Sequence, residues 1–203
     1  SGVTFKVTTA AGEFVPDESG QISSNGIYMT DRDGKITING VVGTLVVTET
    51  KTIPGYVINS NSSSQTVVVN PNDVQTLYFY NDPLCNLTLT KRDSVTGKPV
   101  PNTEFTVRDG NGGLIGRYTT GKDGTVTVTG LVPGSTIVVT ETKVPQGYVL
   151  NPTPQTIILK NGTGNSVVSG GSTGNTDGST GNTGAGGSGG NNLDFENDPT
   201  TTL

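Results

Sequence analysis

The chain has 203 residues, and 12 Lys and Arg against 17 Asp and Glu give it a net charge of −5. It has no His and one Cys, which excludes a His-based catalytic triad, a His or thiolate metal site and an internal disulfide. A net negative chain lacks the basic face that nucleic-acid binding requires, and no apolar run reaches the roughly 20 residues of a membrane-spanning helix.

The expected secondary structure is a series of short β-strands, because β-branched residues recur and turn residues bound each segment. No stretch has sustained helical spacing. In chain order the predicted strands include 35–40 (KITING), 44–49 (TLVVTE), 65–69 (QTVVV), 76–81 (TLYFYN), 87–91 (LTLTK), 125–130 (TVTVTG), 136–141 (TIVVTE) and 193–197 (LDFEN). This pattern predicts an all-β chain built from immunoglobulin-like antiparallel β-sandwiches of about seven strands each.

The sequence repeats itself. Residues 33–49 read DGKITINGVVGTLVVTE, and residues 123–141 read DGTVTVTGLVPGSTIVVTE. Four further pairs of blocks keep the same order, namely VTFKV and TEFTV, ETKTIPGYVI and ETKVPQGYVL, QTVVV and QTIIL, and FYNDP and FENDP. Five blocks in one order indicate two tandem copies of one domain, which we assign to residues 1–83 and 84–203.

The two copies differ at their starts and in one insertion. The second copy opens with LTLTKRDSVTGKPVPN at residues 87–102, whereas the first has only Ser1 and Gly2 there and lacks this opening strand. The final NDPTTTL aligns with NDPLCNL, so we expect both ends to fall inside repeats and more repeats to flank them. An insertion at about 161–192, rich in Gly, Ser, Thr and Asn, is predicted to be a mobile loop.

Three polar residues each end an apolar stripe on the inward face of a predicted strand. Side chains alternate between the two faces of a strand, so every second residue lies on the same face. On these inward faces, Lys91 follows Leu87 and Leu89, Glu141 follows Ile137 and Val139, and Asn197 follows Leu193 and Phe195. Two of the three recur in the first copy, as Glu49 after Leu45 and Val47, and Asn81 after Leu77 and Phe79.

These residue types allow a self-made covalent bond. Burying an amine, a carboxyl and an amide is costly unless the groups meet. Burial in general lowers the pKa of a lysine and raises that of a carboxyl, so such a pair can exist as neutral amine and carboxylic acid. The amine can attack the amide carbonyl, which the acid polarises before passing a proton to the departing ammonia. The hypothesis is a Lys91–Asn197 isopeptide bond promoted by Glu141. A partly buried ion pair, or polar residues at a rim, explains the pattern equally well.

Several blocks resemble a known family. LTKRDSVTGKPVPNTEFTV, TTGKDGTVTVTGLVPG, ETKVPQGYVL and FENDP are similar to the Cna B-type, or SpaA-like prealbumin-like, repeats of Gram-positive surface adhesins and pilins. The resemblance covers most of the second copy and all of the first except its absent opening strand. It implies CnaB-like sandwiches in which the first-strand lysine, the glutamate before the Pro-Gly-Tyr turn and the last-strand asparagine form an intramolecular isopeptide bond. By position, these residues are Lys91, Glu141 and Asn197.

The first copy departs from the family pattern. Glu49 and Asn81 match, but the lysine strand is absent, and Lys6 alternates against its apolar neighbours and is expected to face outward. We therefore predict that Asn81 stays an unpaired, unreacted acceptor, and that the gap leaves an open edge able to receive a strand.

The favoured function is structural, as stalk or pilin-like repeats of an extracellular, cell-wall-attached surface protein whose partners are neighbouring repeats. The alternative is a module that binds a host or matrix protein, which the 5% aromatic content does not favour. We expect no cofactor, no metal, no nucleic acid and no membrane insertion. We also expect no enzymatic activity, because the proposed crosslinking happens once per chain.

Overall fold

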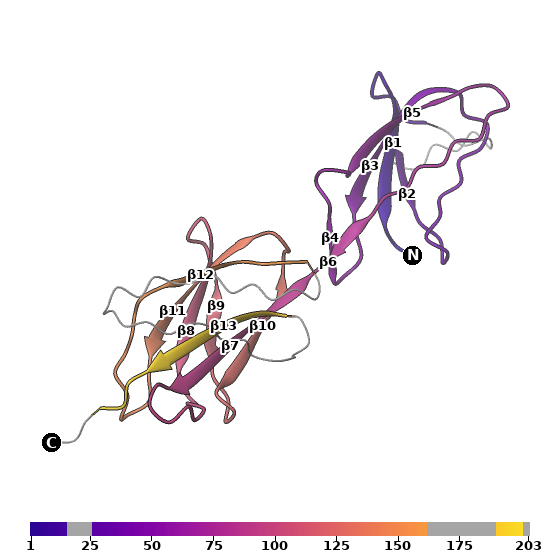
Figure 1. Ribbon diagram of the computed structural model, residues 1–203. Coiled ribbons are helices and arrows are strands. Elements are labelled where there is room, and N and C mark those ends of the chain that lie inside the picture. Colours follow the sequence, from indigo (N-terminus) through magenta and orange to yellow (C-terminus); the bar gives the residue numbers. More distant parts are fainter. Residues whose placement is uncertain (16–25, 162–189, 201–203) are drawn as a thin grey trace, which may run out of the picture. The chain divides into compact units, whose positions relative to one another are not determined.

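The computed structural model describes residues 1–15, 26–161 and 190–200, and the chain divides into two compact units, Ser1–Pro83 and Leu84–Leu203 (Figure 1). Throughout these residues the regular elements are β-strands, which confirms the predicted all-β class. In the same part of the chain, no helix is long and apolar enough to cross a membrane. Most of the predicted loop insertion, residues 162–189, lies outside the described residues.

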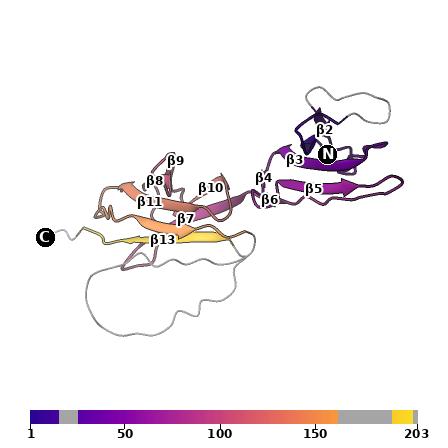
Figure 2. The ribbon, with the colours of Figure 1, turned by 90° about the horizontal axis from the view of Figure 1, so that it is seen from above.

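The second unit is a two-layered sandwich (Figure 2). One sheet has the order β10-β7-β13 and the other has the order β12-β11-β8-β9. The strands are β7 (Cys85–Asp93), β8 (Glu104–Asp109), β9 (Leu114–Thr119), β10 (Thr125–Leu131), β11 (Thr136–Lys143), β12 (Gln155–Ile158) and β13 (Asn191–Asn197). They pack their alternate apolar side chains between the layers, around a core that includes Leu87, Leu89, Phe105, Val107, Val128, Ile137, Val139, Ile157, Leu193 and Phe195.

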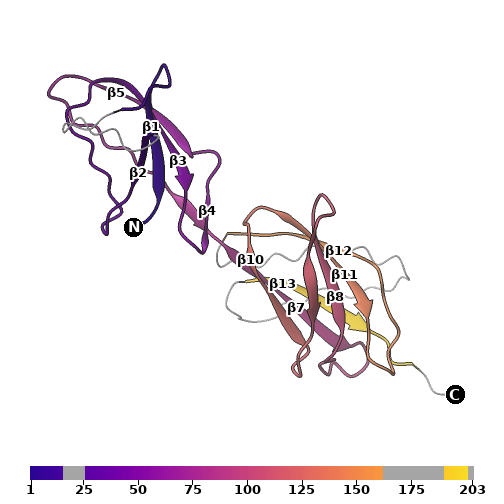
Figure 3. The same ribbon diagram turned by 180° about the vertical axis from the view of Figure 1, so that it is seen from behind.

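The first and last strands of the second unit are neighbours, with β7 lying between β10 and β13 (Figure 3). The pair β7–β13 is parallel, from Leu87 opposite Asn191 to Asp93 opposite Asn197, whereas the other strand pairs of this unit are antiparallel. The predicted antiparallel sandwich is therefore corrected at this one pair. Parallel pairing is possible because the intervening chain carries the backbone through both sheets before it returns beside β7.

The first unit has one four-stranded sheet, β2-β1-β3-β5, and a short two-stranded sheet, β4-β6. Its strands are β1 (Thr4–Thr9), β2 (Ile27–Met29), β3 (Gly43–Lys51), β4 (Tyr56–Ile58), β5 (Ser64–Val69) and β6 (Asn81–Pro83). Its buried hydrophobic cluster is much smaller than that of the second unit and consists of Val7, Val15 and Leu45, with partly buried side chains around them.

Two of the predicted strands of the first unit do not form. Residues 35–40 (KITING) have no strand conformation, and in the segment 76–81 only Asn81 belongs to a strand. Their counterparts in the second unit, β10 and β13, both hydrogen-bond to β7. Within the described residues of the first unit no strand takes the place of β7, so both segments lack the ladder partner that would hold them as strands.

Candidate functional site

Lys91 lies inside the core of the second unit. It continues the inward stripe of Leu87 and Leu89 on β7, and its side chain is 0% exposed. Its neighbour across the β7–β13 ladder is Phe195, whose side chain is also buried. The alternation of β7 therefore carries a lysine amine into the apolar space between the two sheets, as the sequence predicts.

Glu141 approaches the same space from the opposite sheet. It continues the inward stripe of Ile137 and Val139 on β11, and its side chain is 1% exposed. The ladder between β11 and β8 shifts register directly after Glu141, between it and Lys143. A β-bulge of this kind interrupts the regular pairing and bends the strand. Here it lies directly after Glu141.

Asn197 is the last residue of β13 and follows the inward stripe of Leu193 and Phe195. It is 3% exposed. Because Lys91 pairs with Phe195, Asn197 lies two residues further along the adjacent strand and on the same face as Lys91. The first and last strands thus present an amine and a carboxamide to the same side of one sheet.

The three side chains contact one another through Glu141. The amide nitrogen Nδ2 of Asn197 donates a hydrogen bond of 2.7 Å to Glu141 Oε1, and Lys91 Nζ lies 3.9 Å from Glu141 Oε2. Lys91 Nζ also donates to the backbone carbonyl of Arg92 at 3.1 Å. Burial of all three side chains excludes a rim location, whereas the 3.9 Å separation is compatible with a buried ion pair.

The orientation of the amide differs from the hypothesis in one detail. Glu141 faces Nδ2 of Asn197 and not the carbonyl oxygen Oδ1, which is buried without a hydrogen-bond partner among the described residues. A carboxylate has only acceptor atoms and therefore binds the N–H side of an amide. The carboxyl is next to the group that would leave as ammonia, which suits proton delivery to that group better than polarisation of the carbonyl.

Desolvation disfavours the charged form of Lys91. Burial lowers the pKa of Lys91, while the carboxyl of Glu141 acts in the opposite direction. A lower pKa means that the neutral amine, which is the nucleophilic form, becomes easier to reach. The site therefore combines a desolvated amine with a buried carboxyl oxygen that lies 3.9 Å from it.

Two features of this site were not foreseen from the sequence. The rings of Phe105 and Phe195 pack with centroids 4.6 Å apart, and each of them is the ladder neighbour of a site residue, Glu141 and Lys91 respectively. The backbone N–H of Asn151 also donates to Glu141 Oε1 at 3.1 Å. Aromatic residues at inward positions could have indicated the ring pair, but a backbone donor from a loop carries no side-chain signal.

The end of β7 is held by a second polar cluster. Asp93 accepts hydrogen bonds from the backbone N–H groups of Val95 and Thr96 at 2.9 and 2.8 Å. The hydroxyl of Tyr148, from the turn at residues 145–148 (PQGY), donates to the same carboxyl at 3.0 Å. These hydrogen bonds, first among them that of Thr96, lower the pKa of Asp93. The tyrosine thus anchors its turn to the strand that carries Lys91.

Within its described residues, the first unit repeats the contact between Glu141 and Asn197 without a lysine amine beside it. Asn81 Nδ2 donates to Glu49 Oε1 at 2.7 Å, and the rings of Phe5 and Phe79 pack with centroids 4.8 Å apart. Phe5 is the ladder neighbour of Glu49, as Phe105 is of Glu141. Lys6 is exposed, and its Nζ lies 5.8 Å from the ring centre of Phe14, away from this pair.

Other chemistry has little support in the described part of the chain. No group of three His, Cys, Asp or Glu side chains there could hold a metal ion. Cys85 is a partly buried free thiol whose Sγ contacts the carbonyl of Leu131 at 3.4 Å, and burial raises its pKa. A thiol with a raised pKa is a poorer nucleophile at neutral pH.

A family model described as SpaA, prealbumin-like fold domain, matches this chain twice, over residues 1–83 and 85–172. No curated protein sequence matches the chain. The match to the family model covers most of both units. The matched residues include Glu49, Asn81, Lys91 and Glu141.

Several solved structures align with this chain at low identity and with TM-scores below 0.5. The shaft pilin SpaA from Lactobacillus rhamnosus GG is 15% identical, with a TM-score of 0.46, over 100% of this chain and 89% of that one. The Streptococcal ancillary pilin is 20% identical, with a TM-score of 0.45, over 99% of this chain and 58% of that one. The Bacillus anthracis TIE protein is 19% identical, with a TM-score of 0.44, over 98% of this chain and 31% of that one, so this chain spans only part of its length.

Proposed function

Since the chain belongs to the SpaA family of prealbumin-like fold domains, we propose that it is a structural segment of a bacterial cell-surface pilin or adhesin stalk. Residues 1–83 and 84–203 form one repeat each. In the second repeat an isopeptide bond between Lys91 and Asn197, promoted by Glu141, joins the first strand to the last. The bond forms once per chain and makes the protein a tether and not an enzyme.

The proposal is carried by one observation, the burial of an amine, a carboxyl and a carboxamide in contact within one apolar core. Burying all three groups costs free energy that a merely structural role does not require, because well-packed apolar residues would stabilise the same core at least as well. Groups kept in a sandwich despite this cost are candidates for chemistry.

The reaction balances without any cofactor. Glu141 accepts a proton from Lys91, and the neutral Nζ attacks Cγ of Asn197. A new bond forms between Nζ and Cγ, and the bond between Cγ and Nδ2 breaks. Glu141 delivers the proton to Nδ2, which leaves as ammonia, and then takes up the second proton that Nζ loses as the new amide forms. The hydrogen bond between Nδ2 and Glu141 Oε1 aligns this transfer. The fixed geometry of the two strands supplies a high effective concentration of the reacting groups.

The bond would protect the unit against load. Pulling on the start of β7 and the end of β13, two parallel neighbours, slides the strands past each other. A covalent link between them carries that force before the hydrogen bonds of the ladder break. It also closes a loop of about 100 residues, which by analogy with disulfides stabilises the folded state by about 4–5 kcal/mol.

The same role explains the expected surroundings of the chain. A stalk works outside the cell, attached to the cell wall, and its immediate partners are neighbouring repeats of the same surface protein. Such a bond needs neither cysteine nor an oxidising compartment, which suits a chain with a single Cys.

One observation favours the alternative function, binding of a host or matrix protein. Tyr78 and Tyr80 of the first unit are 69% and 72% exposed and alternate with the half-buried Leu77 and Phe79. Tyrosines are enriched in protein interfaces because they combine apolar area with a polar tip. Saturable binding of a matrix protein that is lost in a Tyr78→Ser, Tyr80→Ser variant would support this alternative.

Intact mass followed by a peptide map tests the proposed function. We expect the chain to weigh less than its sequence by the mass of one ammonia, and a branched peptide to join Lys91 to Asn197. A chain of full mass would contradict the bond. Loss of two ammonia molecules would contradict the assignment of Asn81 as unreacted.

A further inference from the structure

The inward face of β7 continues beyond Lys91. Asp93, the last residue of the strand, lies on the same face as Lys91 and is 7% exposed. Its ladder neighbour on β13 is Asn197. Neighbouring strands lie about 4.8 Å apart, so the side chains of Asp93 and Asn197 are adjacent. The core of the second unit therefore holds a second carboxyl, next to both residues of the proposed bond.

The carboxyl of Asp93 is fixed by donors from two segments of the chain. Its Oδ1 accepts the backbone N–H groups of Val95 and Thr96 in the turn after β7, and its Oδ2 accepts the hydroxyl of Tyr148. These hydrogen bonds lower the pKa of Asp93 because they favour its ionised form. A carboxylate held in this way is a poor proton acceptor, so its contribution to the site is its position and its charge.

The turn that carries Tyr148 is also bound to the end of β13. The backbone contacts are a bridge between Tyr148 and Pro199, a hydrogen bond of 3.0 Å from Val149 N–H to the carbonyl of Asp198, and one of 2.8 Å from Thr200 N–H to the carbonyl of Gly147. The backbone N–H of Ser94, directly after β7, donates to the carbonyl of Asn197 at 3.0 Å. The end of β7, the end of β13 and the turn at residues 145–148 are therefore joined to one another.

Beyond Tyr148 the chain returns to Glu141. The backbone N–H of Asn151 donates to Glu141 Oε1 at 3.1 Å, and the same oxygen accepts Nδ2 of Asn197 at 2.7 Å. The segment that Tyr148 anchors thus supplies a donor that orients the carboxyl of Glu141. The hydrogen bond between Asp93 and Tyr148 joins this segment to the strand that carries Lys91.

We propose that Asp93 and Tyr148 are positioning residues for the bond between Lys91 and Asn197. Their hydrogen bond fixes the end of β7 against the segment that orients Glu141 and against the end of β13. Neither side chain exchanges a proton with the reacting atoms. This inference rests on the proposed function, because it assigns the two residues a part in that same reaction.

The backbone at the end of β7 also fixes the amine itself. Lys91 Nζ donates to the carbonyl of Arg92, the residue directly before Asp93, at 3.1 Å. If the end of β7 moves, this acceptor moves and the amine moves with it. A displacement of about 1 Å between reacting groups can slow a reaction by about 100-fold. Release of Asp93 from Tyr148 should therefore slow the formation of the bond.

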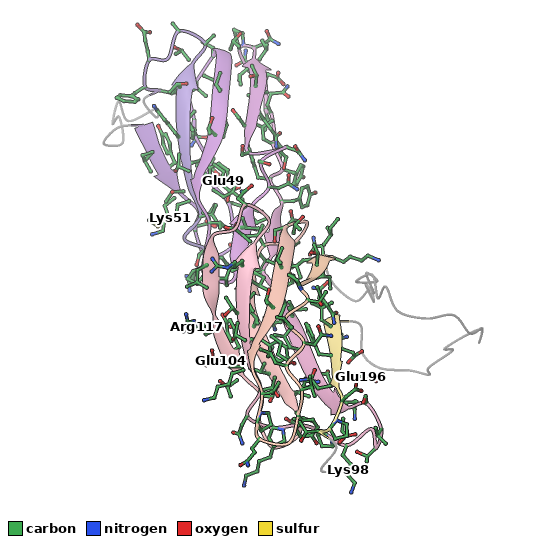
Figure 4. The ribbon with its side chains drawn as sticks, turned by 90° about the vertical axis from the view of Figure 1, so that its left-hand side faces the viewer. Glu49, Lys51, Lys98, Glu104, Arg117 and Glu196 are labelled. Carbon is green, nitrogen blue, oxygen red and sulfur yellow. The ribbon has the colours of Figure 1, made fainter. Side chains whose placement is uncertain are left out.

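Asp93 also places a fixed negative charge near the amine. The carboxyl groups that act on Lys91 are Glu141 on β11, Asp93 on β7, Glu196 on β13 (Figure 4) and Asp198 directly after β13. Desolvation lowers the pKa of Lys91, and these carboxylates act in the opposite direction. Asp93→Asn should therefore lower the pKa of Lys91 further, whereas Tyr148→Phe leaves the charge of Asp93 in place.

The experiment measures how fast the full chain loses ammonia. Chain purified unfolded in urea, and shown by its mass to be unreacted, is diluted into buffer, and samples quenched at timed intervals are weighed. We expect Tyr148→Phe to slow the loss by about tenfold and Asp93→Asn by about 100-fold. The double variant should be no slower than Asp93→Asn, because Tyr148 acts through that carboxyl.

Two readouts separate positioning from a loss of stability. Circular dichroism follows folding, and the rate of ammonia loss is compared only after folding is complete. The alkaline limb of the pH–rate profile reports loss of the proton that Lys91 and Glu141 share. Asp93→Asn should move this limb to lower pH, and Tyr148→Phe should lower the rate without moving it. A role in stability alone would move neither the limb nor the rate in folded chains.

The second unit offers a matched control for each variant. Asp109→Asn changes a carboxyl that, like Asp93, accepts two backbone N–H groups of a turn, from Asn111 and Gly113. This turn joins β8 to β9, and Asp109 pairs with Ile137, at the other end of β11 from Glu141. Tyr118→Phe removes the hydroxyl of another half-buried tyrosine, on β9. Both controls should lose ammonia at the rate of the wild type.

The outcomes separate this inference from the proposed function. If folded Asp93→Asn and Tyr148→Phe chains react at the wild-type rate, the inference is overturned and the proposed bond stands. Equal slowing in the Asp109→Asn and Tyr118→Phe controls would show a general effect of destabilisation and would also overturn the inference. A wild-type chain that folds but loses no ammonia overturns the proposed function, and the inference with it.

Discussion

Glu141 binds Asn197 through a hydrogen bond of 2.7 Å that joins the two sheets of the second unit. The bond runs from the amide nitrogen to the carboxyl, so the leaving group of the proposed reaction faces the group that would protonate it. The other carboxyl oxygen lies 3.9 Å from Lys91 Nζ. One carboxyl thus contacts both residues of the proposed bond from the sheet opposite to them.

Replacing Lys91 with methionine should abolish the isopeptide bond and keep the apolar stem of the side chain. We expect the Lys91→Met chain to retain the ammonia that the wild type loses. Its unfolding free energy should fall by about 4–5 kcal/mol from the lost loop constraint, as measured by urea denaturation of the second unit.

Two further variants separate the bond from the charge. Lys91→Met leaves Glu141 buried without its cation, which adds to the destabilisation, and the double variant Lys91→Met, Glu141→Gln removes that contribution. Lys98→Met, at the exposed lysine marked in Figure 4, should retain the mass and stability of the wild type. If the masses of the Lys91→Met chain and the wild type differ only by the substitution, the wild type has lost no ammonia. That result would contradict the bond.

Glu141→Gln should stop the reaction with little change of shape. Glutamine can still accept the hydrogen bond from Asn197, but it cannot take a proton from Lys91. We expect a folded chain of full mass in which separate peptides containing Lys91 and Asn197 are recovered. Glu196→Gln changes an exposed carboxyl on the same strand as Asn197 (Figure 4) and should leave the loss of ammonia complete. A reacted Glu141→Gln chain would remove Glu141 from the mechanism.

The turn after β7 should lose stability in acid. The hydrogen bonds from Thr96, Val95 and Tyr148 lower the pKa of Asp93 below that of an unfolded aspartate, which is about 3.9. The stabilisation by the ionised carboxylate is therefore present above about pH 4 and is lost as the pH falls through the lower folded value.

Asp93→Asn provides the check on this pH dependence. We expect it to lower the thermal unfolding midpoint at neutral pH and to reduce the further drop that the wild type shows as the pH falls below about 4. Asp194→Asn, at an exposed position on β13, should keep the acid response of the wild type. Identical acid responses for Asp93→Asn and wild type would show that this carboxyl does not contribute.

Single-molecule pulling should reveal the tether directly. With force applied at residues 84 and 200, the bonded second unit can release only the short segments outside Lys91 and Asn197. The Lys91→Met variant should unfold fully and release about 350 Å more chain, since about 100 residues extend by roughly 3.5 Å each. Full extension of the wild-type unit would rule out a load-bearing bond.

Much of the fold and site could be predicted because β-strand alternation is a local property. The inward stripes ending in Lys91, Glu141 and Asn197 follow from period two, and all three side chains are buried. The same reasoning failed for residues 35–40 and 76–80, where strand-forming residues lack a strand partner in the first unit. Their β propensity is real, but a strand also needs a neighbour for its hydrogen bonds.

The sequence by itself determined the duplication, the all-β class and the identity of the buried polar residues, because repeats and alternation are properties of the chain order. Only the tertiary structure decided that β7 and β13 are parallel neighbours, and that Glu141 faces the nitrogen and not the oxygen of Asn197. It also decided that the Glu49–Asn81 pair assembles without a lysine. These facts depend on contacts between segments far apart in the chain, which local patterns do not encode.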